Sequence, residues 1–207
     1  MKWLAPLLLA ASLGAADAPK MFFSRTFPGS KPAYFQVTLA RSGEAEYGEA
    51  VDDDQPLKFR LEDSEAAEVF ALAEKLDFFK RAVESPAKVA FMGTKLLRYE
   101  DGGQKTEVKF NYSDDVSARA LADWFERMGE SARGCIELER AVKYDKLGVV
   151  SALQYIEVEM SRKRLVGLEQ FLPMLDRIIN NATFMHTARE RATEIAATIR
   201  KPKQQGP

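Results

Sequence analysis

Apolar and polar residues alternate with a period of two through much of the first half of the chain. The alternation covers residues 33–39, 45–51 and 57–61, and it is typical of strands with one face in a core and one in water. Ser42-Gly43 supplies a turn between the first two segments. This region is predicted to form an antiparallel meander, with residues 21–27 as an edge strand before the Pro28-Gly29-Ser30 turn. Its apolar face consists of Ala33, Phe35, Val37, Leu39, Ala45, Tyr47, Val51, Leu57, Phe59 and Leu61.

The period changes to that of a helix after residue 62. Asp63-Ser64 offers an N-cap, and Glu65 and Glu68 suit the positive end of a helix. We expect this helix to cross the sheet and to end before Pro86. Its apolar stripe is Val69, Leu72, Ala73, Leu76 and Phe79. A period of two then returns in residues 95–100 and 106–112, which flank Asp101-Gly102-Gly103, a strong hairpin signal.

From residue 113 onward the pattern is helical. Ser113-Asp114-Asp115 caps the first helix, which Gly129 and Gly134 are expected to bend or split. Its stripe is Leu121, Trp124, Phe125, Met128, Cys135, Leu138 and Val142. A second helix carries Val149, Leu153, Ile156 and Met160, a third begins near Leu168 with Pro173 in an early turn, and the last runs from about Thr183 with Phe184, Ala188, Ile195 and Ile199 on one face.

The chain is therefore predicted to be an α+β protein. An antiparallel β-meander with one crossing helix and a β-hairpin is followed by an α-helical C-terminal half. Residues 19–112 form the sheet-plus-helix unit, residues 113–200 a helical hairpin or bundle, and residues 201–207 a disordered tail. The pattern alone does not say whether the halves are independent domains.

The first residues have the form of an export signal. Lys2 precedes the apolar residues 4–11, and Ala16-Asp17-Ala18 has the small-x-small form that signal peptidase accepts. The apolar run is shorter than the roughly 20 residues of a membrane-spanning helix, and no later stretch is long and apolar enough. Residues 1–18 are interpreted as a cleaved signal peptide without a lipoprotein cysteine, cut after Ala16 or Ala18. We expect a bacterial protein that is periplasmic or secreted.

Composition and charge bear on the size of the core and on binding to nucleic acid. A hydrophobic content of 46% with 13 Phe supports a real core, and 30 Lys+Arg against 31 Asp+Glu give a formal charge of −1. Removing residues 1–18 deletes Lys2 and Asp17 and leaves this balance unchanged. The chain lacks the concentrated positive charge that nucleic-acid binding requires.

The nucleophiles and bases of common enzymes are scarce. Cys135 is the single cysteine, so no intramolecular disulfide can form, and we expect it to be buried. His186 is the single histidine, expected on a helix surface or partly buried rather than as a catalytic base. There is no G-x-S-x-G elbow and no thiol-enzyme signature. One His and one Cys cannot supply the usual closed zinc set.

Three charged or glycine-rich runs have structural interpretations. Asp52-Asp53-Asp54 is interpreted as a solvated turn rather than a calcium loop. Because Glu49 is nearby, a weak cation site at this turn stays an alternative. Residues 102–105 lie in a predicted hairpin, not between a strand and a helix as a nucleotide loop would. Arg162-Lys163-Arg164 suits a helix C-terminus, with contact to phospholipid headgroups or to the acid-rich residues 44–68 as the functional alternative. No catalytic, cofactor-binding or metal-binding residue is assigned.

The first half of the mature chain resembles a family of exported bacterial proteins that carry a domain of unknown function. The resemblance lies in RTFPGSKPAYFQVTL (residues 25–39), SGEAEYG (residues 42–48) and LDFF (residues 76–79). Many members of that family have a pair of cysteines around the first turn. Phe27 and Lys31 stand at those places here, so a role tied to the thiols is not implied. The resemblance implies the fold and an exported location, not a mechanism.

Taken together, these observations favour a non-enzymatic exported protein that binds a protein or a small ligand in the cell envelope. We expect no cofactor, no nucleic-acid partner and no membrane span, and the oligomeric state stays open. One alternative is an envelope hydrolase that uses carboxylates such as Asp114, Asp115 or the Asp52 to Asp54 run. Another is a purely structural envelope protein. Two acids facing each other about 5–10 Å apart across a pocket would favour the hydrolase.

The N-terminus of the mature protein tests the export signal. Protein recovered from its native cell should begin at Asp17 or Pro19, because signal peptidase cuts after a small residue. N-terminal sequencing measures this directly. Mature protein that still begins at Met1 and fractionates with the cytosol would contradict the export signal.

Overall fold

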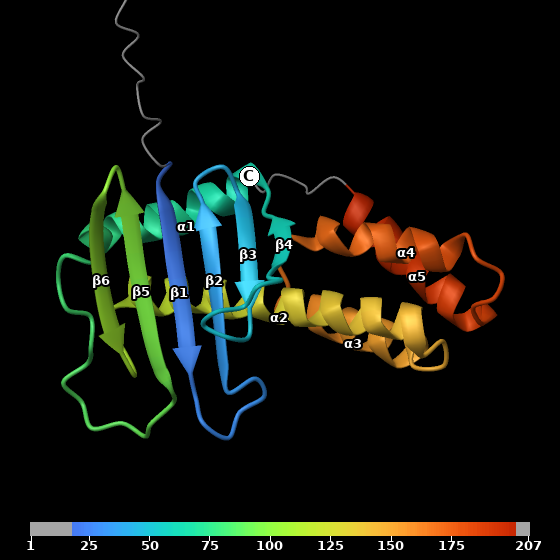
Figure 1. Ribbon diagram of the computed structural model, residues 1–207, viewed down its shortest axis with the longest axis horizontal. Helices are drawn as coiled ribbons and strands as arrows, with labels where there is room; N and C mark the ends of the chain where they lie inside the picture. The colour runs from blue at the N-terminus through green and yellow to red at the C-terminus, as the bar shows by residue number, and fades with distance from the viewer. Residues whose placement is uncertain (1–17, 202–207) are drawn as a thin grey trace, which may run out of the picture.

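The computed structural model describes residues 18–201 and confirms the α+β prediction: one antiparallel sheet is followed by a helical half (Figure 1). Nearly all of the predicted signal peptide, and the tail at residues 202–207, lie outside the described residues. Within residues 18–201, no helix is both long and apolar enough to cross a membrane.

Six strands make up the sheet in the described part of the chain. They are β1 (Lys20–Thr26), β2 (Tyr34–Ala40), β3 (Glu44–Gly48), β4 (Leu57–Arg60), β5 (Thr94–Asp101) and β6 (Gln104–Phe110), in the order β4-β3-β2-β1-β5-β6. The Gly102-Gly103 hairpin is confirmed, because Asp101 pairs with Gln104.

The prediction that residues 21–27 form an edge strand is wrong. β1 pairs with β2 on one side and with β5 on the other, which makes it a central strand. Met21 and Phe23 are fully buried. Alternation in a sequence shows which face of a strand is buried, but it does not show which strands will lie beside it.

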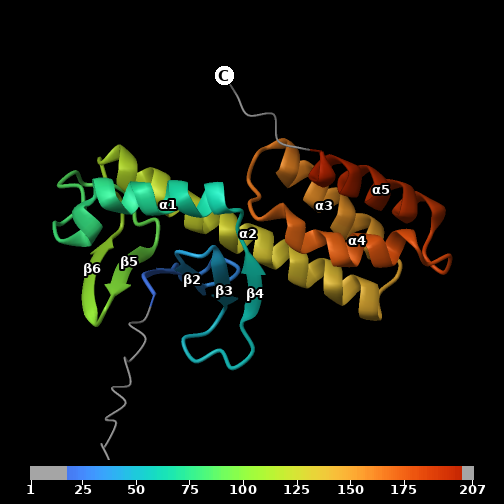
Figure 2. The same ribbon diagram turned by 90° about the horizontal axis from the view of Figure 1, so that it is seen from above.

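One face of the sheet carries the core. α1 (Asp63–Lys75) and the first half of α2 (Val116–Tyr144) lie on that face, and the opposite face is partly exposed (Figure 2). The predicted apolar positions of β2, β3 and β4 point into this core, but Ala33 and Val51, which lie outside the strands, are exposed. Val51 is 69% exposed, because β3 ends at Gly48 and the chain then turns through a loop.

The N-cap of α1 lies one residue earlier than predicted. Its N-cap residue is Glu62 rather than Asp63 or Ser64, and the Glu62 N–H donates to Glu65 Oε2 at 3.1 Å. A short turn of 3-10 helix, η1 (Asp77–Phe79), follows the helix. The apolar stripe packs on the sheet as expected.

α2 is capped as predicted but is not broken by its glycines. Asp115 Oδ1 accepts the Ser117 N–H at 2.8 Å, and the helix then runs unbroken for 29 residues. A Cβ at Gly129 would lie 2.9 Å from Phe35 Cε2, and one at Gly134 would lie 3.4 Å from Tyr155 Cε1. Gly129 therefore allows a close approach of the Phe35 ring, Gly134 lies in ordinary packing contact with rings, and neither bends the helix.

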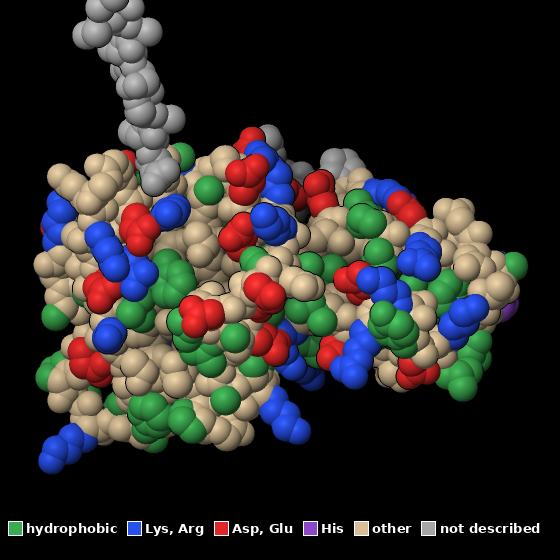
Figure 3. Space-filling model, viewed as in Figure 1, with side chains coloured by type: hydrophobic (Ala, Val, Ile, Leu, Met, Phe, Trp, Pro, Cys, Tyr) green, Lys and Arg blue, Asp and Glu red, His purple; other side chains and the backbone are tan. Residues whose placement is uncertain are grey.

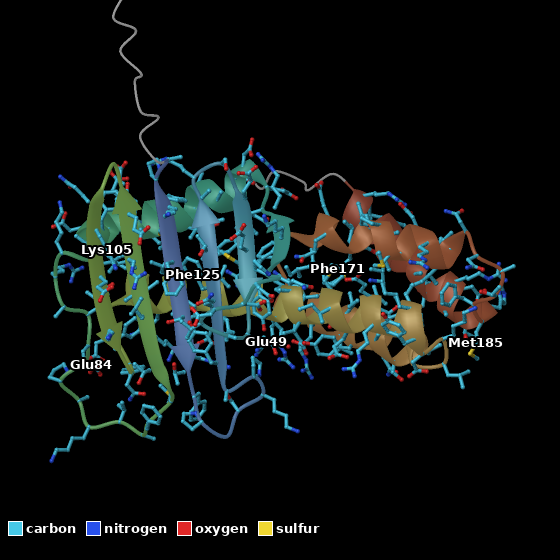
Figure 4. The ribbon with its side chains drawn as sticks, in the orientation of Figure 1. Glu49, Glu84, Lys105, Phe125, Phe171 and Met185 are labelled. Atoms are coloured by element: carbon cyan, nitrogen blue, oxygen red, sulfur yellow. The ribbon has the colours of Figure 1, made fainter. Side chains whose placement is uncertain are left out.

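The helical half forms a second core around the end of α2. Its elements are α3 (Val149–Ser161), η2 (Leu168–Phe171), α4 (Leu172–Ile179) with Pro173 in its first turn, and α5 (His186–Arg200), which begins three residues later than predicted. Figure 4 labels one aromatic ring from each core, Phe125 beneath the sheet and Phe171 in the bundle. α2 contributes side chains to both cores, so the two halves share one helix.

Phe59 tests the phase of the sheet. It is 8% exposed in the first core, so Phe59→Ala is expected to lower the free energy of unfolding by about 3–5 kcal/mol. Urea denaturation measures the change. The control is Lys58→Ala on the opposite face, where the exposed pair with Glu46 at 3.3 Å should contribute no more than about 1 kcal/mol. A larger loss from Lys58→Ala than from Phe59→Ala would show that β4 faces the other way.

Candidate functional site

Cys135 and His186 belong to different environments. Cys135 is 8% exposed, which confirms its predicted burial, and burial raises the pKa of its thiol to about 11. Its nearest polar partner is the Gln170 carbonyl, 3.8 Å from Sγ. His186 is exposed at the start of α5, with Nε2 3.1 Å from Glu190 Oε1. The structure does not bring the two residues together as a dyad.

The carboxylates considered for hydrolysis hold local structure. In the β3–β4 loop, Asp53 accepts the N–H groups of Glu49 and Gln55 at 3.3 and 3.0 Å. At the start of α2, Asp114 accepts a hydrogen bond from the Ser85 hydroxyl, and Asp115 is 2.8 Å from Arg81 Nη2. The hydrogen bond from Arg81 holds the pKa of Asp115 below its usual value. Among residues 18–201, no group of three or more His, Cys, Asp or Glu could hold a metal ion.

The basic run at the end of α3 has an internal partner. Arg162 Nη1 and Arg164 Nε lie 3.2 and 3.1 Å from the two oxygens of Glu159, which is only 8% exposed. Two of the three cations therefore neutralise a buried carboxylate, an arrangement that the sequence pattern did not predict.

A groove of about 690 Å³ lies between α2 and α3. Small residues, including Gly134, Ala141 and Ala152, line it between Tyr144 and Tyr155. Its charged side chains are of both signs: Arg133, Glu137, Arg140 and Asp145. The mixed charge indicates no particular class of ligand.

A second pocket, of about 310 Å³, lies at the end of the sheet where β1 and β6 end and β5 begins. The first turns of α2 close its other side. Its lining residues are Arg25, Phe27, Met92, Lys95, Phe110, Asn111, Tyr112, Ser113, Arg119, Ala122, Asp123 and Glu126. Aromatic rings and cations converge here, and this combination marks the pocket as the candidate site.

Lys95 is the distinctive residue of the pocket. It is 9% exposed, and its Nζ donates to the Asn111 carbonyl at 3.1 Å and lies 6.0 Å from the centre of the Phe110 ring. Burial lowers the pKa of Lys95, while Glu126 opposes that shift. Among the described residues, no carboxylate oxygen lies within 4.0 Å of Nζ. An ammonium has three protons to donate, so Lys95 retains donors for a further acceptor.

The pocket lining contains more cations than acids. Arg119 Nη1 donates to the carbonyls of Ser113 and Asp114 at 3.0 and 2.9 Å, and these carbonyls do not cancel its charge. Arg25 Nη1 is 3.9 Å from Glu126. The remaining acid of the lining, Asp123, pairs at 2.9 Å with Arg127, which lies outside the pocket. Within the lining, three cations thus face two acids, one of which is already paired elsewhere, while Glu84 outside the lining also acts on Lys95.

One signal in the sequence could have identified this site. Lys95 and Leu97 share the buried face of β5, so a lysine occupies a position where the alternation calls for an apolar residue. Such a lysine is unusual, because a buried cation without an ion pair is costly. The other lining residues come from four separated segments, and no local pattern connects them.

No family model, curated protein or solved structure matches the chain. The resemblance of residues 25–79 to an exported family therefore stays a prediction.

The burial of Lys95 has a measurable consequence. Because its pKa is lowered in the folded protein, the unfolded chain binds more protons below the ordinary value of 10.5, and stability rises as the pH approaches that value. Lys95→Met should leave the free energy of unfolding unchanged or raise it by on the order of 1 kcal/mol at pH 7.

The difference between the two proteins should shrink as the pH rises toward 10.5, and urea denaturation across that range measures it. A loss of several kcal/mol at pH 7 would instead show that Lys95 has a structural role.

Proposed function

We propose that the protein is an exported, non-enzymatic binding protein whose pocket at the end of the sheet holds a small amphiphilic anion. The observation that carries this proposal is Lys95, a cation 9% exposed in a pocket wall, whose Nζ has a carbonyl and no carboxylate as its polar partner. A buried cation opposes folding unless it is paired, and a carboxylate or phosphate group of a ligand would supply the missing partner.

The lining suits both ends of such a ligand. Arg25, Lys95 and Arg119 supply charge-assisted donors for an anionic head. Phe27, Met92 and Phe110 supply an apolar wall for a short alkyl or aromatic part. A volume of about 310 Å³ is at the lower end of the range for small-molecule sites.

The lining favours binding over catalysis. Ser113, the one hydroxyl nucleophile besides Tyr112 in the lining, is 1% exposed, and its Oγ accepts the Asp115 N–H at 3.2 Å. A nucleophile of this kind needs a neighbouring base to activate it, and the pocket acids Asp123 and Glu126 face arginines instead.

The test is calorimetric titration with octanoate and with octyl phosphate, each below its micelle concentration, and 1-octanol as the neutral comparison. The anions should bind and the alcohol should bind weakly, because only the anions pair with Lys95. Lys95→Met should weaken anion binding by roughly 10- to 100-fold, as expected for losing a hydrogen bond to a charged group.

Lys105→Met is the matched control. Lys105 is an exposed lysine at the opposite end of β6 (Figure 4), so its removal should leave anion binding unchanged. Binding of octanol as tight as that of octanoate, or an unchanged affinity in Lys95→Met, would contradict the proposed site.

A further inference from the structure

Two loops project together beyond the end of the sheet. They are residues 27–33, between β1 and β2, and residues 85–93, before β5, and we call them the tip loops. Thr26 pairs with Thr94 at the last position of the β1–β5 ladder, so both loops leave the sheet at the same end (Figure 1). The Phe27 and Phe91 rings meet edge to face, with centroids 5.9 Å apart.

The tip loops expose large apolar side chains. Phe91 is 57% exposed, Met92 43% and Val89 42%. In Figure 3, hydrophobic side chains gather at this end of the molecule, and Lys or Arg side chains extend on both sides of them. Exposed apolar residues that cluster in this way mark an interaction surface rather than ordinary surface scatter.

Hydrogen bonds hold the exposed residues in place. Asn111 Oδ1 accepts the Met92 N–H at 2.7 Å, and Asn111 Nδ2 donates to the Ala90 carbonyl at 3.1 Å. In the other loop, the Ser30 hydroxyl lies 2.7 Å from both the Phe27 and the Pro32 carbonyls. The apolar side chains are therefore presented by fixed backbone, which lowers the ordering cost of docking.

The charge of the tip loops has a single sign. Lys31 and Lys88 are exposed, and neither loop contains an acidic residue. The nearest acid along the chain, Glu84, accepts the Asn111 N–H at 2.6 Å, and in Figure 4 it lies beside the end of β6 rather than at the tip. This contrasts with the chain as a whole, whose formal charge is −1.

We propose that the tip loops dock the protein peripherally on an anionic phospholipid surface. A convex tip of fixed apolar side chains between two lysines fits a membrane interface, where rings enter the headgroup region and ammonium groups meet lipid phosphates. Phe27 and Met92 of the tip loops also line the proposed pocket, but Val89, Phe91, Lys31 and Lys88 do not, so the inference goes beyond that pocket and does not depend on it.

The test is co-sedimentation with phosphatidylcholine vesicles prepared with and without phosphatidylglycerol. The unmodified protein should bind the anionic vesicles, and increasing the ionic strength should weaken that binding. Val89→Ser combined with Phe91→Ser should reduce partitioning about tenfold or more, because two apolar side chains no longer leave water. All proteins carry the same N-terminus, so any contribution of residues 4–11 is common to them.

Two further variants separate charge from apolar contact. Lys31→Glu combined with Lys88→Glu should reduce binding to anionic vesicles about tenfold or more and leave binding to phosphatidylcholine unchanged. Lys75→Glu combined with Lys201→Glu makes the same change of net charge at exposed positions away from the tip, and it should have a much smaller effect. Leu147→Ser, at a side chain 78% exposed at the turn between α2 and α3, controls for the loss of exposed apolar surface.

A local readout shows which part of the protein touches the lipid. Brominated lipids should quench the added fluorescence of Phe91→Trp and not that of Leu147→Trp. Failure of the unmodified protein to bind anionic vesicles, or equal effects of the tip and control variants, would overturn the proposal. Loss of octanoate binding in Lys95→Met with vesicle binding intact would confirm that docking of the tip does not require the anion site at Lys95.

Discussion

The packing of α2 across the sheet is the interaction on which the rest of the structure depends. The Phe125 ring of α2 stacks on Phe23 of β1 with centroids 5.1 Å apart and planes 9° apart, and Gly129 admits the Phe35 ring one turn further on. A six-stranded sheet with one apolar face needs a cover, and α2 supplies it together with α1. α2 then continues past β4, and the side chains of its remaining turns pack in the second core.

The same helix also encloses the candidate site. α2 begins at Val116, beside the end of the sheet, so its first turns close one side of the pocket that contains Lys95. The cover does not extend beyond the end of the strands. Phe91 and Met92 in the loop before β5 consequently remain in water, although they are adjacent to the buried part of the sheet.

The pocket and the tip have one property in common. Each contains a residue whose position lowers the stability of the folded protein. A lysine on a buried face of β5 loses hydration that its single carbonyl partner does not replace. Exposed Phe91 and Val89 leave apolar area in water that folding could have removed. Such departures from the rules of folding are expected at functional positions. A bound ligand can pair with a buried charge, and a membrane surface can cover exposed apolar side chains.

The sequence by itself determined the elements and the faces they bury. Periods of two and of 3.6 mark the strands and helices, because the side-chain directions of each follow from local backbone geometry. The hairpin at Gly102-Gly103 and the cap at Asp115 are equally local. The tertiary structure alone decided that β1 is central, that Gly129 and Gly134 pack against rings, and that Arg162 and Arg164 neutralise Glu159. It also decided that Lys95 meets Arg25 and Arg119 in one pocket, and that residues 27–33 meet residues 85–93 at one tip. These outcomes join residues far apart in the chain, and such contacts depend on which strands pair and which helix covers them, information that no short window of sequence contains.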